Sequence, residues 1–84
     1  MARAYEQTAR AESAADTRRR IIDAVIDRLR KAPAERISVD AVARKAGVAR
    51  STVYLIFGSR AGLFDAVALE VYDRASASLA TTVA

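Results

Sequence analysis

Residues 39–58, with the sequence VDAVARKAGVARSTVYLIFG, contain the strongest structural signal in the chain. Three constrained positions within them are a small residue, Ala43, a glycine, Gly47, and a β-branched residue, Val53. Ala43 lets a following helix cross close to the one before it, and Gly47 can adopt the left-handed backbone conformation that ends a helix. Val53 can then pack beneath the crossing. This spacing predicts a helix-turn-helix, in which the outer face of the second helix stays free for a partner, rather than two helices that merely pack together.

An amphipathic helix is expected before this motif. Its apolar residues repeat at three- and four-residue spacing, namely Ile21, Ile22, Val25, Ile26 and Leu29. The repeat predicts a helix that begins at Asp16 or Thr17, either of which can cap it, and that runs to about Lys31. Residues 1–16 are polar and alanine-rich without apolar periodicity, so they are expected to form a flexible or frayed arm.

Three further helices are expected within and after the motif. Ser38 should cap a helix over residues 39–46, with Asp40 favourably placed in its first turn. A third helix is expected from about residue 49 or 50 to Phe57. Ser59 should cap a fourth helix, whose inward stripe is Leu63, Phe64, Val67 and Val71. The sequence therefore predicts an all-α fold: a homeodomain-like, three-helix helix-turn-helix domain followed by the start of a fourth helix.

Composition narrows the classes of function. The chain has no cysteine and no histidine, which excludes disulfides, thiol chemistry and most zinc sites and suits a reducing cytosol. Its acids are scattered rather than paired, so it is not expected to be an enzyme, and neither a cofactor nor a metal site is expected. No apolar run approaches the roughly 20 residues of a membrane span, and no signal peptide is visible, so a cytoplasmic location is expected.

The positive charge accompanies the motif. The chain has a net charge of +4, yet residues 17–60 hold 11 Lys or Arg against four acidic residues. A clustered basic surface on a small domain is typical of a polyanion partner, and together with a helix-turn-helix it favours DNA.

The third helix contains the candidate reading residues. Arg50 has the reach and the forked donors to bind a guanine edge or a phosphate, the alternative being an exposed surface arginine. Ser51 and Thr52 suit phosphate hydrogen bonds, although Thr52 could instead be partly buried packing. Tyr54 is expected to contact a phosphate or a base, the alternative being a core residue, and Leu55 could touch a thymine methyl group.

Further arginines are candidates for phosphate contact. Arg18, Arg19 and Arg20 are expected in the first turn of the first helix, where the helix dipole disfavours cations. With the free N–H groups of that terminus they could hold a DNA phosphate, the alternative being a solvated basic face. Arg60 follows the cap of the fourth helix and is interpreted as a second phosphate clamp. Weaker candidates for the same face are Arg36, Arg44 and Lys45.

The segments TRRRIIDAVI and ISVDAVARKAGVARSTVYLIFGSRAGLFDAV closely resemble the N-terminal DNA-binding domain of the TetR family of bacterial transcription regulators. The resemblance covers about residues 17–72 and implies that the third helix enters the major groove. It implies DNA contacts from Arg50, Ser51, Thr52, Tyr54, Leu55 and Arg60. Ala49 stands where the family often has a capping hydroxyl, Ile56 replaces a frequent histidine, and Ala61 and Gly62 replace the usual acidic residues.

The resemblance also implies a domain organisation. Residues 1–16 would be the arm, 17–74 the DNA-binding domain, and 75–84 the start of the connection to a C-terminal domain outside this chain. That domain would bind a small-molecule inducer and form a homodimer on a palindromic, double-stranded DNA operator. Four apolar residues off the core stripe are expected to dock on it: Leu69, Tyr72, Leu79 and Val83.

Two functions of different class follow. The first is the sequence-specific DNA-binding domain of a transcription regulator, a ligand-responsive repressor. The alternative is a basic amphipathic module, in which TRRRIIDAVIDRLRK docks on an acidic protein or membrane surface. Asp23 and Asp27 on the polar face of that segment argue against anionic lipid, whereas Arg50 and Tyr54 favour DNA, so no membrane partner is expected.

Overall fold

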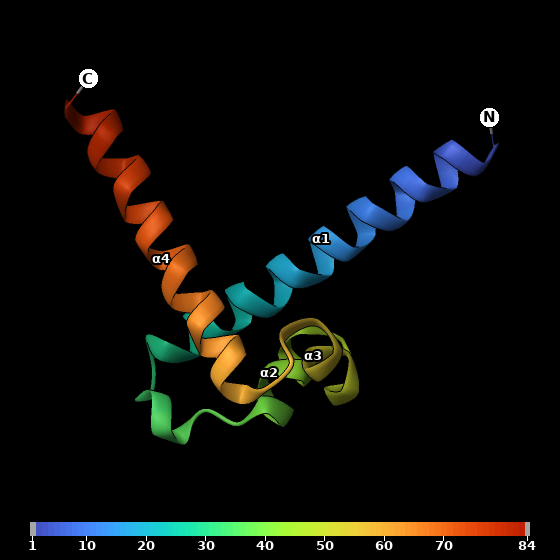
Figure 1. The fold of residues 1–84 in the computed structure, drawn as a ribbon. Coiled ribbons are helices and arrows are strands. Elements are labelled where there is room, and N and C mark those ends of the chain that lie inside the picture. Colours follow the sequence, from blue (N-terminus) through green and yellow to red (C-terminus); the bar gives the residue numbers. More distant parts are fainter. Residues whose placement is uncertain (1, 84) are drawn as a thin grey trace.

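The computed structural model describes the backbone of residues 2–83 and the side chains of residues 13–78. Within this part, the elements in chain order are α1 (Ala2–Leu29), the short 3₁₀ helix η1 (Ala34–Arg36), α2 (Val39–Ala46), α3 (Arg50–Phe57) and α4 (Arg60–Val83). The long helices α1 and α4 diverge from a vertex like the arms of a V, and α2 and α3 lie beneath that vertex (Figure 1). The fold is all-α, as the sequence predicts.

The first helix is much longer than the sequence analysis predicts. α1 begins at Ala2, so the predicted start at Asp16 or Thr17 is wrong. The residues before Asp16 are mostly alanine, glutamate, glutamine and arginine without glycine or proline, and such residues propagate a helix readily. The Thr17 hydroxyl donates to the Ser13 carbonyl oxygen one turn earlier, at 2.9 Å, as it does inside a helix rather than at its cap.

The helix-turn-helix follows its predicted boundaries. The Ser38 hydroxyl oxygen accepts a hydrogen bond from the Ala41 amide at 3.1 Å, which caps α2. Gly47 has a φ of +74°, the left-handed conformation that ends α2 and turns the chain toward α3. Ala49 makes no side-chain cap bond at the start of α3, which agrees with the missing hydroxyl there.

The turn between α3 and α4 explains one departure from the family pattern. The Ser59 hydroxyl oxygen accepts from the Gly62 amide at 2.9 Å, so α4 is capped without an acidic partner. A Cβ at Gly62 would collide with the carbonyl oxygen of Phe57. Glycine at this position therefore lets the first turn of α4 approach the end of α3 closely.

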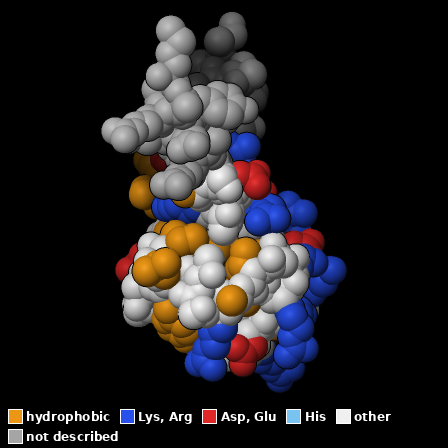
Figure 2. Space-filling model, turned by 90° about the vertical axis from the view of Figure 1, so that its right-hand side faces the viewer, with side chains coloured by type: hydrophobic (Ala, Val, Ile, Leu, Met, Phe, Trp, Pro, Cys, Tyr) orange, Lys and Arg blue, Asp and Glu red, His pale blue; other side chains and the backbone are white. Residues whose placement is uncertain are grey.

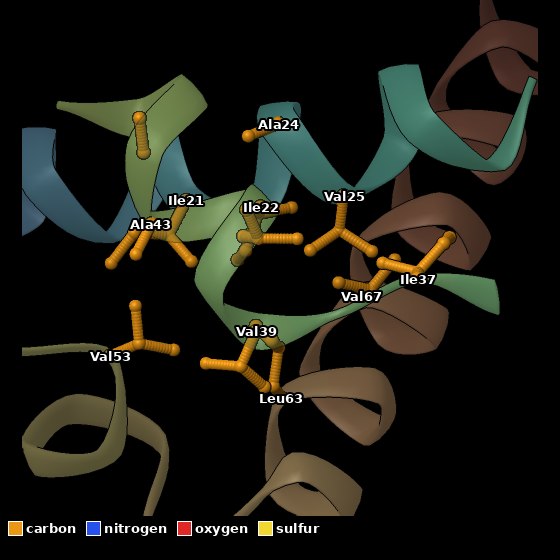
Figure 3. Packing of buried hydrophobic residues seen from close by; sticks show 12 residues of the cluster. Ile21, Ile22, Ala24, Val25, Ile37, Val39, Ala43, Val53, Leu63 and Val67 are labelled. Atoms are coloured by element: carbon orange, nitrogen blue, oxygen red, sulfur yellow. The ribbon is translucent and has the colours of Figure 1, made fainter. Parts of the chain in front are cut away.

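One apolar cluster joins the four α-helices (Figure 3). Its buried members are Ile21, Ile22, Ala24, Val25, Ile37, Val39, Val42, Ala43, Ala46, Val53, Leu63 and Val67. Val53 is 1% exposed, which confirms its predicted place beneath the helix crossing, and Phe57 is half-buried. Leu29 and Val71 were expected in the core stripes but are 38% and 46% exposed, so these two predictions are wrong.

The positions of these two residues in their helices account for both errors. The molecule measures 44 × 40 × 18 Å, and Val71 lies on the part of α4 that diverges from α1, where no described element covers its stripe. Leu29 is the last residue of α1, at the opposite end of that helix from its diverging arm. Leu69 and Tyr72 are exposed, as expected for residues off the core stripe. Leu79 and Val83 lie outside the residues whose side chains are described.

Polar contacts join α1 and α4 at the vertex, in addition to the apolar cluster. Arg74 in α4 donates from Nη2 to Asp23 Oδ1 in α1 at 2.6 Å and from Nε to Glu70 Oε1 at 3.0 Å. Its pKa is raised above the ordinary value, chiefly by the hydrogen bond to Asp23. Arg74 therefore ties the two arms of the V together where they begin to separate.

In the described part of the chain, no single helix is long and apolar enough to cross a membrane. α3 and residues Arg60–Ser78 together have the length and composition of a span, but the chain bends by 69° between them. No group of three or more potential metal-ligating side chains occurs among the same residues.

Candidate nucleic-acid interface

The outward face of α3 brings together the residues proposed to read DNA. Arg50 and Ser51 are exposed, and Leu55 is 86% exposed although it is apolar. Thr52 and Tyr54 are half-buried, and Tyr54 packs against the edge of the core. Because Val53 anchors the opposite side of the helix, this face is presented on a rigid support.

Arg50 is held between two helices. Its Nε lies 3.5 Å from Oδ1 of Asp40 in α2, and its guanidinium carbon lies 5.4 Å from the centre of the Tyr54 ring. The pKa of Arg50 is raised above its ordinary value, first by a side-chain hydrogen bond with Tyr54 and then by the negative charge of Asp40. The side chain is thus charged and oriented at the surface where α2 and α3 meet.

Asp40 is the residue of this surface that the sequence analysis missed. Its place in the first turn of α2 suggested only a favourable interaction with the helix dipole. Asp40 in α2 pairs with Arg50 in α3, on the other side of the turn. The three- and four-residue spacing of side-chain pairs within one helix therefore does not predict this contact. The only sequence signal for this pair is the presence of an acidic residue on the outer face of one helix of the motif and an arginine on the outer face of the other.

The three consecutive arginines Arg18, Arg19 and Arg20 of α1 have different contacts. The Arg18 guanidinium lies 5.6 Å from the centre of the Phe57 ring at the end of α3. Arg19 lines a pocket of about 230 Å³ between α1 and α4, and Arg20 Nε pairs with Asp16 Oδ2 at 3.5 Å. Because α1 begins at Ala2, these residues lie inside a helix, and the predicted help from free N–H groups of a helix terminus is wrong.

Arg60 is exposed but is held by contacts within the protein. Its Nη2 donates to the carbonyl oxygens of Ala34 at 2.7 Å and Ile37 at 3.1 Å, and its guanidinium carbon lies 4.5 Å from the centre of the Phe64 ring. The side chain thereby fastens η1 and the segment before α2 to the first turn of α4. A phosphate contact from Arg60 stays a prediction, and it would have to coexist with this internal role.

A basic groove flanks α2. It has a volume of about 550 Å³, and its lining includes the four cationic side chains Arg28, Lys31, Arg44 and Lys45. Asp27 neutralises part of this charge, because its Oδ2 lies 2.5 Å from Lys45 Nζ and 3.4 Å from Lys31 Nζ. These contacts lower the pKa of Asp27, the hydrogen bond to Lys45 having the largest effect. Arg28 and Lys31 therefore belong to the same cationic surface as Arg44 and Lys45.

Charge and apolar surface are separated on this side of the molecule. Figure 2 shows Lys and Arg side chains along the right-hand and lower edges of the globular part, and hydrophobic side chains mainly toward the left. Such a one-sided distribution is typical of a surface that meets a polyanion.

Comparison with known proteins identifies a matching family. Residues 21–67 match the family model described as bacterial regulatory proteins, tetR family. The match includes the end of α1, all of α2 and α3, and the beginning of α4. No match was found to a curated protein or to a solved structure.

Proposed function

Because the chain belongs to the TetR family and is a DNA-binding domain of a transcription regulator, we propose that it reads a specific operator and acts in a ligand-responsive repressor. In this proposal α3 enters the major groove of double-stranded DNA. The observation that carries it is the outward face of α3, where Arg50, Ser51 and Leu55 are exposed on a helix anchored by Val53.

Each proposed contact follows from the chemistry of its side chain. Arg50 donates to a guanine edge, and Leu55 packs against a thymine methyl group. Ser51, Thr52 and Tyr54 donate hydroxyl groups to phosphates and fix the register of the helix. Additional backbone contacts come from Arg18, Arg19, Arg20 and Arg60, of which Arg18 lies beside α3 and is the best placed.

The proposed assembly is a homodimer on a palindromic operator. A two-fold dimer presents one α3 to each half-site, which is how helix-turn-helix proteins obtain high affinity. The exposed Leu69 and Tyr72 on α4 are proposed to pack against a C-terminal domain that dimerises and binds a small-molecule inducer. We place this regulator in the cytoplasm, where an operator is accessible.

The test is selection of duplexes from a randomised DNA pool, followed by binding titrations with the enriched and the unselected duplexes. Enrichment of a defined sequence supports the proposal, whereas equal binding to all duplexes contradicts it. Vesicles of anionic lipid, titrated in parallel, test the alternative of a basic amphipathic module. Vesicle binding without duplex binding would overturn the DNA-reading function.

Within this test, Arg50→Ala distinguishes a contact to a base from a contact to the DNA backbone. We expect it to weaken binding to the enriched duplex by about 1–3 kcal/mol and to relax the preference at one or two base pairs. Arg44→Ala is the control, since an exposed cation that meets only phosphates should weaken binding to all duplexes alike. Equal losses on enriched and unselected DNA for Arg50→Ala would show that this residue reads no base.

A further inference from the structure

Asp40 places a negative charge on the surface that DNA is proposed to approach. Its carboxylate is exposed in the first turn of α2, next to the outward face of α3. A carboxylate there repels phosphates, so it weakens binding to every duplex irrespective of sequence. A residue with this unfavourable effect is expected to have a compensating role.

Stability is a weak explanation for the Asp40–Arg50 pair. The side chains are 55% and 61% exposed, and their closest charged atoms are 3.5 Å apart. Exposed ion pairs of this kind contribute about 0–1 kcal/mol to folding. The favourable interaction of Asp40 with the α2 dipole requires no arginine from another helix.

The geometry instead restricts the direction of the Arg50 side chain. Asp40 engages Nε, at the base of the guanidinium fork, and the Tyr54 ring lies 5.4 Å from the guanidinium carbon. One constraint comes from α2 and the other from α3, so the fork is oriented relative to both helices. A free arginine side chain has about 2 kcal/mol of rotamer entropy to lose on binding, and prior ordering reduces that loss.

We propose that Asp40 is the specificity-determining partner of Arg50: it positions the guanidinium for one base pair and at the same time penalises non-specific DNA. The inference rests on the proposed DNA-reading function and deepens it, since it assigns sequence discrimination to a pair from two helices. Asp40 acts through Arg50 and is therefore a positioning residue, which does not itself read a base.

A double-mutant cycle tests this assignment. The four proteins are the unaltered chain, Asp40→Asn, Arg50→Ala and the double variant, each titrated with the enriched duplex and with unselected duplex. Asp40→Asn should lower the ratio of the two affinities by a factor of about three to ten, while binding to unselected DNA becomes tighter. In the Arg50→Ala background the same substitution should leave the ratio unchanged.

The chain offers a closely matched control. Arg20 Nε and Asp16 Oδ2 form another exposed pair at 3.5 Å, on α1. Asp16→Asn removes the same charge and the same kind of pair, and it should leave the preference among duplexes unaltered. A loss of discrimination equal to that of Asp40→Asn would mean that net charge alone is responsible, which overturns the positioning role.

Two other results would also overturn it. They are an unchanged affinity ratio in Asp40→Asn, and an effect of Asp40→Asn that persists without Arg50. A measurement on the free protein keeps this inference separate from the proposed function: ¹⁵N relaxation of the Arg50 Nε–H group should show more motion in Asp40→Asn. If the unaltered chain prefers no DNA sequence, the proposed function fails. If the motion of the Arg50 Nε–H group is the same in Asp40→Asn as in the unaltered chain, only the positioning role of Asp40 fails.

Discussion

At the scale of single residues, Arg50 and Arg60 show how similar side chains acquire different tasks. Both lie at the start of a helix and both were expected to meet DNA. Arg50 pairs with the exposed carboxylate of Asp40 in α2, whereas Arg60 donates to the backbone carbonyl oxygens of Ala34 and Ile37. Their neighbours, not their positions in the sequence, distinguish the proposed reading residue Arg50 from Arg60, which fastens parts of the protein together.

Arg60→Lys separates these two roles of Arg60. Lysine keeps the positive charge that a phosphate needs, but it lacks the planar guanidinium that lies against the Phe64 ring while its Nη2 reaches both carbonyl oxygens. We expect the free energy of unfolding to fall by about 1 kcal/mol while DNA affinity per folded molecule is largely retained. Denaturant unfolding and duplex titration provide the two measurements.

Arg60→Ala is the companion variant, and it should lose both stability and affinity. If Arg60→Ala unfolds at the same denaturant concentration as the unaltered chain, the bonds to Ala34 and Ile37 contribute nothing. In that case the interpretation of Arg60 as a fastener is incorrect.

At the scale of elements, the close approach of α3 and α4 depends on Gly62. Replacing a glycine inside a helix by alanine ordinarily stabilises a protein, by about 1 kcal/mol. Here the added Cβ would meet the Phe57 carbonyl oxygen, which is backbone and cannot rotate away. The tertiary contact therefore reverses the sign expected from helix propensity.

We expect Gly62→Ala to lower the free energy of unfolding by about 1–3 kcal/mol, as overpacking does. Ala61→Ser, at the exposed neighbouring position, should change it by less than about 0.5 kcal/mol. Thermal or denaturant unfolding measures both. A Gly62→Ala variant that is more stable than the unaltered chain would show that α3 and α4 are not packed as closely as described.

The link between α1 and α2 predicts a dependence of stability on pH. Lys45 and Lys31 lower the pKa of Asp27 below its usual value of 3.8, so the unfolded chain binds a proton more readily than the folded one. The contribution of Asp27 is therefore complete above about pH 4 and is lost as the pH falls through its lowered pKa. Unfolding curves of the unaltered chain and Asp27→Asn should differ at neutral pH and converge in acid.

Asp65→Asn is the control for the loss of one negative charge, because Asp65 is exposed and Lys31 and Lys45 pair with Asp27. It should change the free energy of unfolding at neutral pH less than Asp27→Asn does. A constant difference between the unaltered chain and Asp27→Asn at all pH values would exclude the Lys45 and Lys31 contacts as its source.

At the scale of the whole molecule, the cationic surface predicts salt-dependent binding. If about three side chains per protomer meet phosphates, the logarithm of the binding constant should fall against the logarithm of salt concentration with a slope of roughly −3. Arg18→Gln should reduce the magnitude of that slope by about 1, since Arg18 lies beside α3. Duplex titrations at several salt concentrations provide the measurement.

Arg74→Gln is the matched control for the slope. Its guanidinium is held by Asp23 and Glu70 at the vertex of the V, so its removal should not change the number of phosphate contacts. A slope near zero for the unaltered chain would contradict phosphate contact by the arginines of α1 and by Arg60.

The sequence by itself determined the features that form between near neighbours. Ser38 and Ser59 cap their helices and Gly47 ends α2, because each of these interactions joins groups within four residues. The buried position of Val53 was equally accessible, since it follows from helical periodicity. The length of α1 does not follow from apolar periodicity, which residues 1–16 lack, although their helix propensity is high.

Only the tertiary structure decided which distant groups meet. Asp40 pairs with Arg50, Arg60 fastens η1, and Arg74 reaches Asp23 across 51 positions of the chain. The divergence of α1 and α4 also decided that Val71 is exposed, and Leu29 is exposed at the last position of α1, although both continue their apolar stripes. Periodicity specifies which face of a helix is apolar, but the crossing of the helices determines how far along its length that face is covered.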